Sequence, residues 1–199
     1  KNKIKAIYNP YLDKINKKKN KKTKYLISIG RLRKQKDHET LLNAFYIFSK
    51  KNKEYKLIIL GHGNLKIKLK KLARDLKINN RVIFKGWVKN TLTYLKLSKI
   101  FVLSSVYEGL GNVLIDSINY NTPCISTDCH SGPREILLNG KGGYLVKVKS
   151  PELLAEKINF CVNNYSKALK KNLIAKKTLN RFLITTQSKK YFDYLTKHN

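Results

Sequence analysis

Short apolar runs alternate along the chain with segments whose apolar residues recur at helical spacing. Six runs have the length and composition of buried strands: residues 25–29, 55–60, 81–85, 99–103, 123–127 and 143–147. Four segments between them carry the helical pattern: residues 38–50, 65–77, 91–98 and 112–120. After residue 150 the pattern is helical to the end, in two or three lengths. Asp37 suits the N-cap of the first helix, and Pro151 suits the first turn of a later one.

Strands that alternate with helices predict right-handed βαβ units and a parallel sheet. The predicted fold class is α/β: a Rossmann-like, doubly wound parallel sheet of about six strands with helices on both faces, followed by C-terminal helices. In such sheets, ligands bind beyond the carboxyl ends of the strands, where the strand order reverses. We expect residues 1–24 to be a linker from a missing N-terminal domain, with solvated lysines over 16–24. Residues 25–165 are expected to form a nucleotide-binding domain, and 166–199 a helical tail.

The formal net charge is +31 at pH 7, with 43 Lys and Arg against 12 Asp and Glu. Such a charge favours nucleic acid or an anionic membrane surface as a partner. However, only six of the basic residues are arginine, and Asn, Ile and Tyr are abundant. These residues and lysine share A/T-rich codons, so a biased genome accounts for the lysines without any partner. Nucleic acid is the least favoured of the three interpretations, because aromatic residues are not interleaved with a compact basic motif.

The cysteines, Cys124, Cys129 and Cys161, are odd in number and lack CxxC spacing. This pattern argues against a disulfide framework and against a zinc site. Cys124 and Cys161 lie in apolar patterns and are predicted to be core thiols. A reducing cytoplasm is the expected location, and attachment to the inner face of the cell membrane is an open alternative.

The segment SSVYEGLGNVLIDS (104–117) follows the fourth predicted strand and separates Glu108 from Asp116 by seven residues. Gly109 and Gly111 place a turn between this strand and the next helix. Backbone N–H groups at such a helix start suit a phosphate, and carboxylates suit hydroxyl-rich ligands. The segment therefore indicates a sugar-nucleotide site. For Asp116, a solvent-facing helix position is the alternative.

Further candidates follow the first three strands. Arg31 and Lys36, after Gly30, are placed to bind a diphosphate with a guanidinium and an ammonium group. The alternative is one more lysine-rich loop. Gly61 opens a Gly-His-Gly sequence that fails the dinucleotide fingerprint and is interpreted as a tight turn near the ligand. Trp87 is expected either to stack on a nucleobase or to pack against a helix.

The fifth strand is followed by DCHSGPRE (128–135), in which the Ser-Gly-Pro turn is expected to start a short helix and line the same cleft. Cys129 and His130 are adjacent on a turn, where side chains rarely face each other. We therefore expect no catalytic pair here. No set of residues in the sequence has metal-ligand spacing.

Six segments together resemble the C-terminal, donor-binding half of family 4 glycosyltransferases, which are retaining enzymes of the GT-B fold. The segments are SIGRLRKQKDHETLLNAF, LIILGHGN, VIFKGWV, FVLSSVYEGLGNVLIDS, PCISTDCHSGPREIL and GGYLV, over residues 25–147. The IYNP turn at 7–10 resembles the linker that precedes this half. The DCHSGPREI variant resembles enzymes that build lipopolysaccharide, capsule or lipid-linked oligosaccharides.

The resemblance implies a role for each matching position. Arg31 and Lys36 would hold the donor diphosphate, and Glu108 would contact the transferred sugar, which makes these three the catalytic candidates. Asp116 would bind the ribose hydroxyls, although the family usually has the longer glutamate there. Backbone N–H groups would serve the sugar and phosphates, from Gly111, Asn112, Val113 and Leu114. No obligatory metal is implied, and a UDP-sugar is the expected donor.

The expected activity of the whole enzyme is transfer of a hexose from a nucleotide-diphosphate sugar with retention. The expected partners are a nucleotide sugar and the missing acceptor-binding domain, with an anionic membrane surface left open. The chain alone is expected to bind nucleotide weakly and to transfer nothing. Two alternatives are a sugar-nucleotide epimerase of the same fold and a basic module that binds membrane or nucleic acid.

Overall fold

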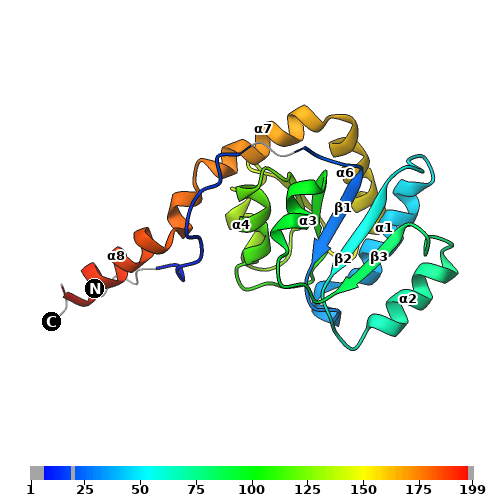
Figure 1. Cartoon of the computed structure of the whole chain (residues 1–199), viewed down its shortest axis with the longest axis horizontal. Coiled ribbons are helices and arrows are strands. Elements are labelled where there is room, and N and C mark those ends of the chain that lie inside the picture. Colours follow the sequence, from blue (N-terminus) through cyan, green and yellow to red (C-terminus); the bar gives the residue numbers. More distant parts are fainter. Residues whose placement is uncertain (1–6, 19–20, 197–199) are drawn as a thin grey trace.

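A computed structural model describes residues 7–18 and 21–196 of the 199-residue chain. Six parallel strands form one sheet in the order β3-β2-β1-β4-β5-β6 (Figure 1). They are β1 (Tyr25–Ile29), β2 (Lys56–Leu60), β3 (Val82–Gly86), β4 (Ile100–Leu103), β5 (Cys124–Thr127) and β6 (Tyr144–Val146). Each begins and ends within one residue of a predicted strand.

Helices cover both faces of the sheet (Figure 1). One face packs against α1 (His38–Ser49), α2 (Lys66–Asp75) and α6 (Pro151–Asn163). The other packs against α3 (Leu92–Leu97), α4 (Asn112–Asn119) and α5 (Pro133–Ile136). The predicted fold class is confirmed.

The strands are apolar throughout because alternate residues point to opposite faces and both faces are buried. In β2, Leu57 and Ile59 belong to one core cluster, whereas Ile58 and Leu60 belong to the other. The helix ends also follow from the sequence. The carboxylate of Asp37 accepts a hydrogen bond from the backbone N–H of Thr40 at 3.2 Å, and Pro151 is the first residue of α6.

The C-terminal part consists of α7 (Tyr165–Lys176), a 3₁₀ turn (Leu179–Phe182) and α8 (Ile184–Thr196). Figure 1 shows α8 projecting from the body of the domain, with the N-terminal segment running beside it. Leu12 forms a parallel bridge with Leu183. Among the described residues, no helix combines the length and apolarity needed to span a bilayer.

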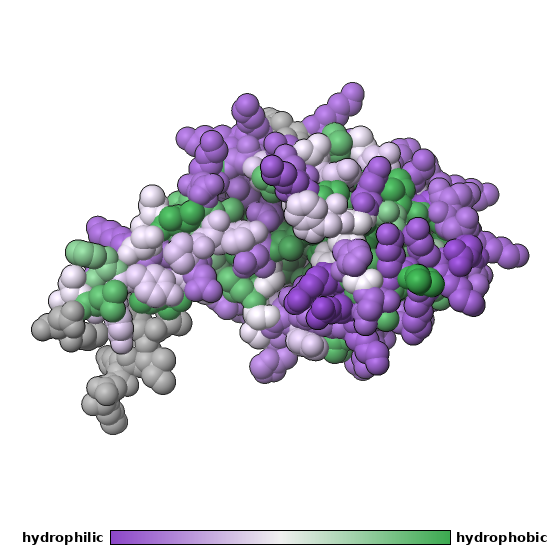
Figure 2. Space-filling model, turned by 60° about the horizontal axis from the view of Figure 1, so that its bottom comes forward, coloured by the Kyte–Doolittle hydropathy of each residue, from purple (hydrophilic) through white to green (hydrophobic). Residues whose placement is uncertain are grey.

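Hydrophilic side chains cover most of the face seen in Figure 2, and apolar side chains gather on the part that projects. Lys22, in the lysine-rich segment, is not solvated as expected. The ammonium group of Lys22 donates to the hydroxyl of Thr122 at 2.6 Å and to the carbonyl of Leu95 at 3.2 Å. Burial lowers the pKa of Lys22 to about 8. This lysine therefore ties the N-terminal segment to the domain.

The remaining expectations concern the cysteines, the N-terminal linker and the C-terminal tail. All three cysteines are free and buried, as predicted for Cys124 and Cys161. Residues 1–6, 19–20 and 197–199 lie outside the described residues, so the expected linker and tail are described only in part. The three-unit division of the chain stays a prediction.

Candidate functional site

The candidate site lies where the strand order reverses, between β1 and β4. The loops that follow these two strands are bonded to each other. The backbone N–H of Val106 donates to the carbonyl of Gln35 at 2.8 Å, and the Gln35 amide donates to the carbonyl of Tyr107 at 3.0 Å. The hydroxyl of Ser104 donates to the carbonyl of Lys36 at 2.8 Å. The two loops therefore form one rigid unit.

A buried ion pair lies at the centre of this unit. The ammonium nitrogen of Lys36 is 2.5 Å from Oε1 of Glu108, and the Ser105 hydroxyl donates to the same oxygen at 2.5 Å. The side chains of Lys36 and Glu108 are only 15% and 6% exposed. Charge-assisted bonds of this kind are stronger than neutral ones. The sequence predicted Lys36 and Glu108 at the same edge of the sheet, and in the structure the two side chains form an ion pair.

His38 lies at the start of α1, two residues after Lys36, and is 3% exposed. Burial, helped by the nearby Lys36 charge, lowers the pKa of His38 to about 4. The imidazole is therefore neutral at pH 7 and adds no positive charge near Lys36. Sequence reasoning missed this residue, because a lone histidine after a helix cap carries no distinct signal.

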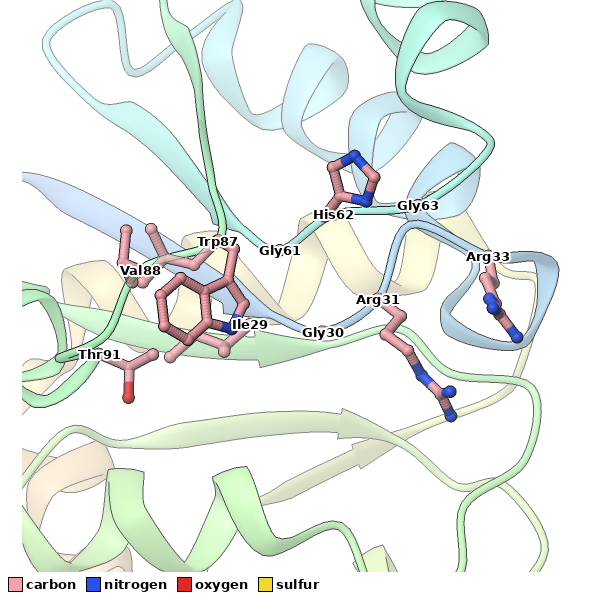
Figure 3. Close-up of a pocket in the computed structure, with 11 residues that line it drawn as sticks. Ile29, Gly30, Arg31, Arg33, Gly61, His62, Gly63, Trp87, Val88 and Thr91 are labelled. Carbon is pink, nitrogen blue, oxygen red and sulfur yellow. The ribbon is translucent and has the colours of Figure 1, made fainter.

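A pocket of about 420 Å³ opens beside the ends of β1, β2 and β3. Its lining residues are Ile29, Gly30, Arg31, Arg33, Leu60, Gly61, His62, Gly63, Trp87, Val88 and Thr91. Figure 3 shows the Trp87 ring beside Ile29 and Thr91, whereas Arg31 extends from the loop on the other side. Trp87 is 76% exposed, so it does not pack against a helix. An exposed indole at a pocket rim can stack on a planar ligand.

Two glycines allow the β1 and β2 loops to approach each other at this pocket. Gly61 has a φ of +142°, and a Cβ there would overlap the carbonyl oxygen of Gly30. A Cβ at Gly63 would overlap the backbone of Leu32, whose N–H donates to the carbonyl of His62 at 3.0 Å. Both glycines line the pocket and allow this close backbone approach, whereas the turn lies just after them, at Asn64 and Leu65.

The helix α4 begins after Gly111, which has a φ of +82° and caps the helix with no side chain. Among the four residues expected to present N–H groups, Leu114 already donates to the carbonyl of Gly111 at 2.8 Å. Asn112 and Val113 occupy the first two positions of the helix, whose N–H groups have no acceptor within a helix. The N–H groups of Asn112 and Val113 therefore suit the start of α4 to an anion.

Asp116 lies one turn further along α4 and is half-buried rather than solvent-facing. Burial raises its pKa, whereas a hydrogen bond from Tyr11 acts in the opposite direction. The Tyr11 hydroxyl donates to Oδ2 of Asp116 at 2.6 Å. Asp116 is not among the residues that line the pocket at Trp87. Sequence reasoning selected Asp116 but missed Tyr11, which lies 105 residues away along the chain.

The loop after β5 packs against the Glu108 loop. The hydroxyl of Ser131 donates to the carbonyl of Gly109 at 2.9 Å, and His130 forms a bridge with Tyr107. A Cβ at Gly132 would overlap the carbonyl oxygen of Leu110, so this contact requires glycine. Within residues 7–18 and 21–196, no three His, Cys, Asp or Glu side chains gather as metal ligands would.

The sheet is all-parallel and doubly wound, with a polar cluster at its switch point and a pocket beside the ends of β1, β2 and β3. These features define the α/β class in which ligands bind at the carboxyl ends of the strands. Comparison with protein families narrows this class. The model of the group 1 glycosyl transferases matches residues 12–178, so the chain belongs to that family.

Similar proteins agree with this assignment. An uncharacterised glycosyltransferase of Methanocaldococcus jannaschii is 40% identical over 80% of this chain and 45% of its own length. A Campylobacter jejuni enzyme, N-acetylgalactosamine-N,N'-diacetylbacillosaminyl-diphospho-undecaprenol 4-alpha-N-acetylgalactosaminyltransferase, is 36% identical over 64% of this chain and 34% of its own length. The chain thus spans less than half the length of each.

Solved structures of GT-B glycosyltransferases share the fold. A mutant of Staphylococcus aureus TarM, solved with Fondaparinux, alpha-GlcNAc-glycerol and UDP, superposes with a TM-score of 0.86 at 25% identity. The match covers 94% of this chain and 38% of TarM. Anabaena HepE, solved with UDP and glucose, matches in fold, with a TM-score of 0.80 at 19% identity over 87% of this chain and 48% of HepE.

Proposed function

We propose that this chain is the donor-binding half of a retaining hexosyltransferase that uses a nucleotide-diphosphate sugar, with a UDP-sugar as the favoured donor. The observation that carries the proposal is the buried Lys36–Glu108 pair at the switch point, 2.5 Å between its charged atoms. The Lys36 side chain lies next to Gly30, which lines a pocket together with Arg31 and Trp87. Relatives named for lipopolysaccharide and lipid-linked glycan synthesis support an acceptor of this class.

The diphosphate is assigned to Arg31 and Lys36. A guanidinium binds two phosphate oxygens at once, and an ammonium adds a point charge. As the bond between the sugar and the diphosphate breaks, negative charge grows on the leaving phosphate. Positive groups already in place offset that charge without reorganising. The two residues therefore act in the transition state as well as in binding.

Glu108 is assigned to the transferred sugar. Lys36 and Ser105 both contact Oε1, which leaves Oε2 to accept a hydrogen bond from a sugar hydroxyl. The N–H groups of Asn112 and Val113 at the start of α4 are assigned to the sugar and the phosphates of the donor. Trp87 stacks on the base, and Asp116 accepts hydrogen bonds from the ribose.

The acceptor site is assigned to a domain outside this chain, because the chain spans less than half the length of its curated relatives. The isolated chain then binds nucleotide weakly and does not turn over. A lipid-linked acceptor would place the whole enzyme at the inner face of a membrane. The 31 excess positive charges would favour an anionic surface there.

A thermal-shift screen of UDP, GDP and ADP and their sugars tests the donor site. At least one nucleotide should raise the melting temperature of the wild-type chain. Arg31→Ala should abolish the shift, and the control Arg74→Ala, an exposed arginine on α2, should retain it. Absence of a shift with all ligands, for the chain and for a protein that restores an N-terminal half, would refute the proposal.

The reaction itself is tested with the restored two-domain protein. NMR of the anomeric proton should show the product with the same configuration as the donor. An inverted product would remove the retaining mechanism, and an altered free sugar nucleotide would support an epimerase. Binding to anionic vesicles that survives Arg31→Ala and Glu108→Ala, with no nucleotide affinity, would instead support a basic binding module.

A further inference from the structure

The carboxylate of Asp116 is held by a residue that precedes the sheet. The hydroxyl of Tyr11 donates to Oδ2 at 2.6 Å, in a part-buried contact. Among the described residues, no other donor lies within hydrogen-bond distance of this carboxylate. Oδ1 is therefore the oxygen left to accept from a ligand.

Tyr11 is itself fixed by its backbone. The N–H groups of Tyr11 and Leu12 donate to the carbonyl of Phe182 at 3.2 and 2.9 Å, and Ile184 donates to the carbonyl of Leu12 at 2.9 Å. Leu12 is 6% exposed in the core cluster beneath α4. The phenol ring thus reaches Asp116 from a segment that is bonded on both sides. Its hydroxyl is therefore held close to the Asp116 carboxylate.

The chemistry of this contact differs from an ion pair. Burial and the nearby Asp116 charge raise the pKa of Tyr11, so the hydroxyl keeps its proton throughout the physiological range. A neutral donor orients the carboxylate without cancelling its charge. An ionised carboxylate is an acceptor only, which suits the two hydroxyls of a ribose. Aspartate is one methylene shorter than glutamate and has fewer rotamers, so a fixed partner can set its direction.

We propose that Tyr11 is a positioning residue for ribose recognition, one that aims the free oxygen of Asp116 at the ribose hydroxyls of the donor. The inference rests on the proposed function, since it needs a nucleotide in the site. It gives the segment before the sheet a part in selecting ribonucleotides over deoxyribonucleotides. A purely structural contact would affect the stability of the chain but not this selection.

The test is a pair of equilibrium titrations of the 199-residue chain, with UDP and with its 2′-deoxy and 3′-deoxy analogues. The wild type should prefer UDP. Tyr11→Phe keeps the ring and removes only the donor, so affinity for UDP should fall about fivefold to tenfold. Affinity for the analogue that lacks the recognised hydroxyl should change little. The ratio of the affinity for UDP to the affinity for that analogue should therefore approach one.

Tyr8→Phe is the matched control. Tyr8 lies in the same segment as Tyr11, and its hydroxyl contacts the carboxylate of Glu135. The backbone N–H of Tyr8 donates to the side-chain oxygen of Gln187 at 3.1 Å. Tyr8→Phe thus removes a tyrosine–carboxylate contact but not the one at Asp116, and should retain the wild-type preference. In an Asp116→Asn background, Tyr11→Phe should cause no further loss of ribose preference, which tests the coupling even if Tyr11→Phe alone weakens the fold.

Two failures are distinguishable. If the wild type binds none of the nucleotides, the proposed function fails and this inference falls with it. If the wild type prefers UDP and Tyr11→Phe keeps that preference, or weakens all ligands equally, only the role of Tyr11 is overturned.

Discussion

The two carboxylates of the site, Glu108 and Asp116, are held in opposite ways. Glu108 receives an ammonium group and a hydroxyl from loops at the carboxyl edge of the sheet. Asp116 receives a single neutral hydroxyl from a segment that precedes the sheet. Glu108 is therefore anchored by charge within the domain body, and Asp116 is oriented by a contact that crosses the domain.

This difference has energetic consequences. The loss of one partner from a buried ion pair leaves a charge without compensation, which is strongly destabilising. The loss of a neutral partner removes one hydrogen bond, and the carboxylate can recruit water. We infer that both carboxylates are held in place, Glu108 by an ion pair whose loss is costly and Asp116 by one neutral hydrogen bond whose loss costs less. The two are proposed to serve different parts of one donor, the sugar and the ribose.

The largest expected effect follows Lys36→Met. This change leaves the Glu108 carboxylate buried with only the Ser105 hydroxyl, and should lower the free energy of unfolding by about 3–5 kcal/mol. Urea denaturation measures it. The control Lys71→Ala breaks the exposed pair with Asp75, where the side chains are 69% and 54% exposed, and should change stability by at most about 0.5 kcal/mol.

The same experiment can break the comparison. If Lys36→Met costs no more than Lys71→Ala, the Glu108 charge is not held as described. The double variant Lys36→Met with Glu108→Leu removes both charges and should regain most of the lost stability, because no unpaired charge remains.

A smaller effect is expected for Asp116→Asn. The amide oxygen can still accept from the Tyr11 hydroxyl, and the variant no longer buries a charge, whose burial raises the pKa of Asp116. The change in unfolding free energy should be about 1 kcal/mol or less. Urea denaturation measures this change as well. If Asp116→Asn lowered the free energy of unfolding as much as Lys36→Met, the two carboxylates would be held equally strongly and the comparison would be wrong.

The third effect is a pH dependence at His38. Its folded-state pKa of about 4 lies below the ordinary value of 6.5, so the unfolded chain takes up the proton first as the pH falls. The stability that the folded chain owes to a neutral His38 is fully present above pH 6.5 and is lost progressively between about pH 6.5 and pH 4. His38→Gln lacks this titration. The stability of the wild type relative to His38→Gln should therefore decrease over that window, and a constant difference would show that His38 is not buried as a neutral group.

Much of the fold could be predicted because its determinants are local and periodic. Each strand is a short apolar run between polar turns, and the cap at Asp37 and the proline at 151 mark helix starts. The switch-point site could be located because parallel strands bring their carboxyl ends to one edge. Arg31, Lys36, Glu108 and Trp87 were selected for that reason.

The supporting contacts could not be predicted, because they join residues far apart in the chain. Tyr11 meets Asp116 across 105 positions, and Lys22 meets Thr122 across 100. Neither contact leaves a periodic pattern. The lysine-rich segment instead suggested uniform solvation, which is wrong at Lys22. The direct bond between Lys36 and Glu108 also depends on side-chain direction, which spacing does not determine.

The division of roles between the two carboxylates can be measured with the single tryptophan, Trp87, as a fluorescent reporter at the pocket rim. The chain, Glu108→Gln and Asp116→Asn would each be titrated with UDP and with the UDP-sugar that stabilises the chain most. Glu108→Gln should weaken the UDP-sugar relative to UDP, whereas Asp116→Asn should weaken both by the same factor. Equal effects of both variants on both ligands would contradict the account.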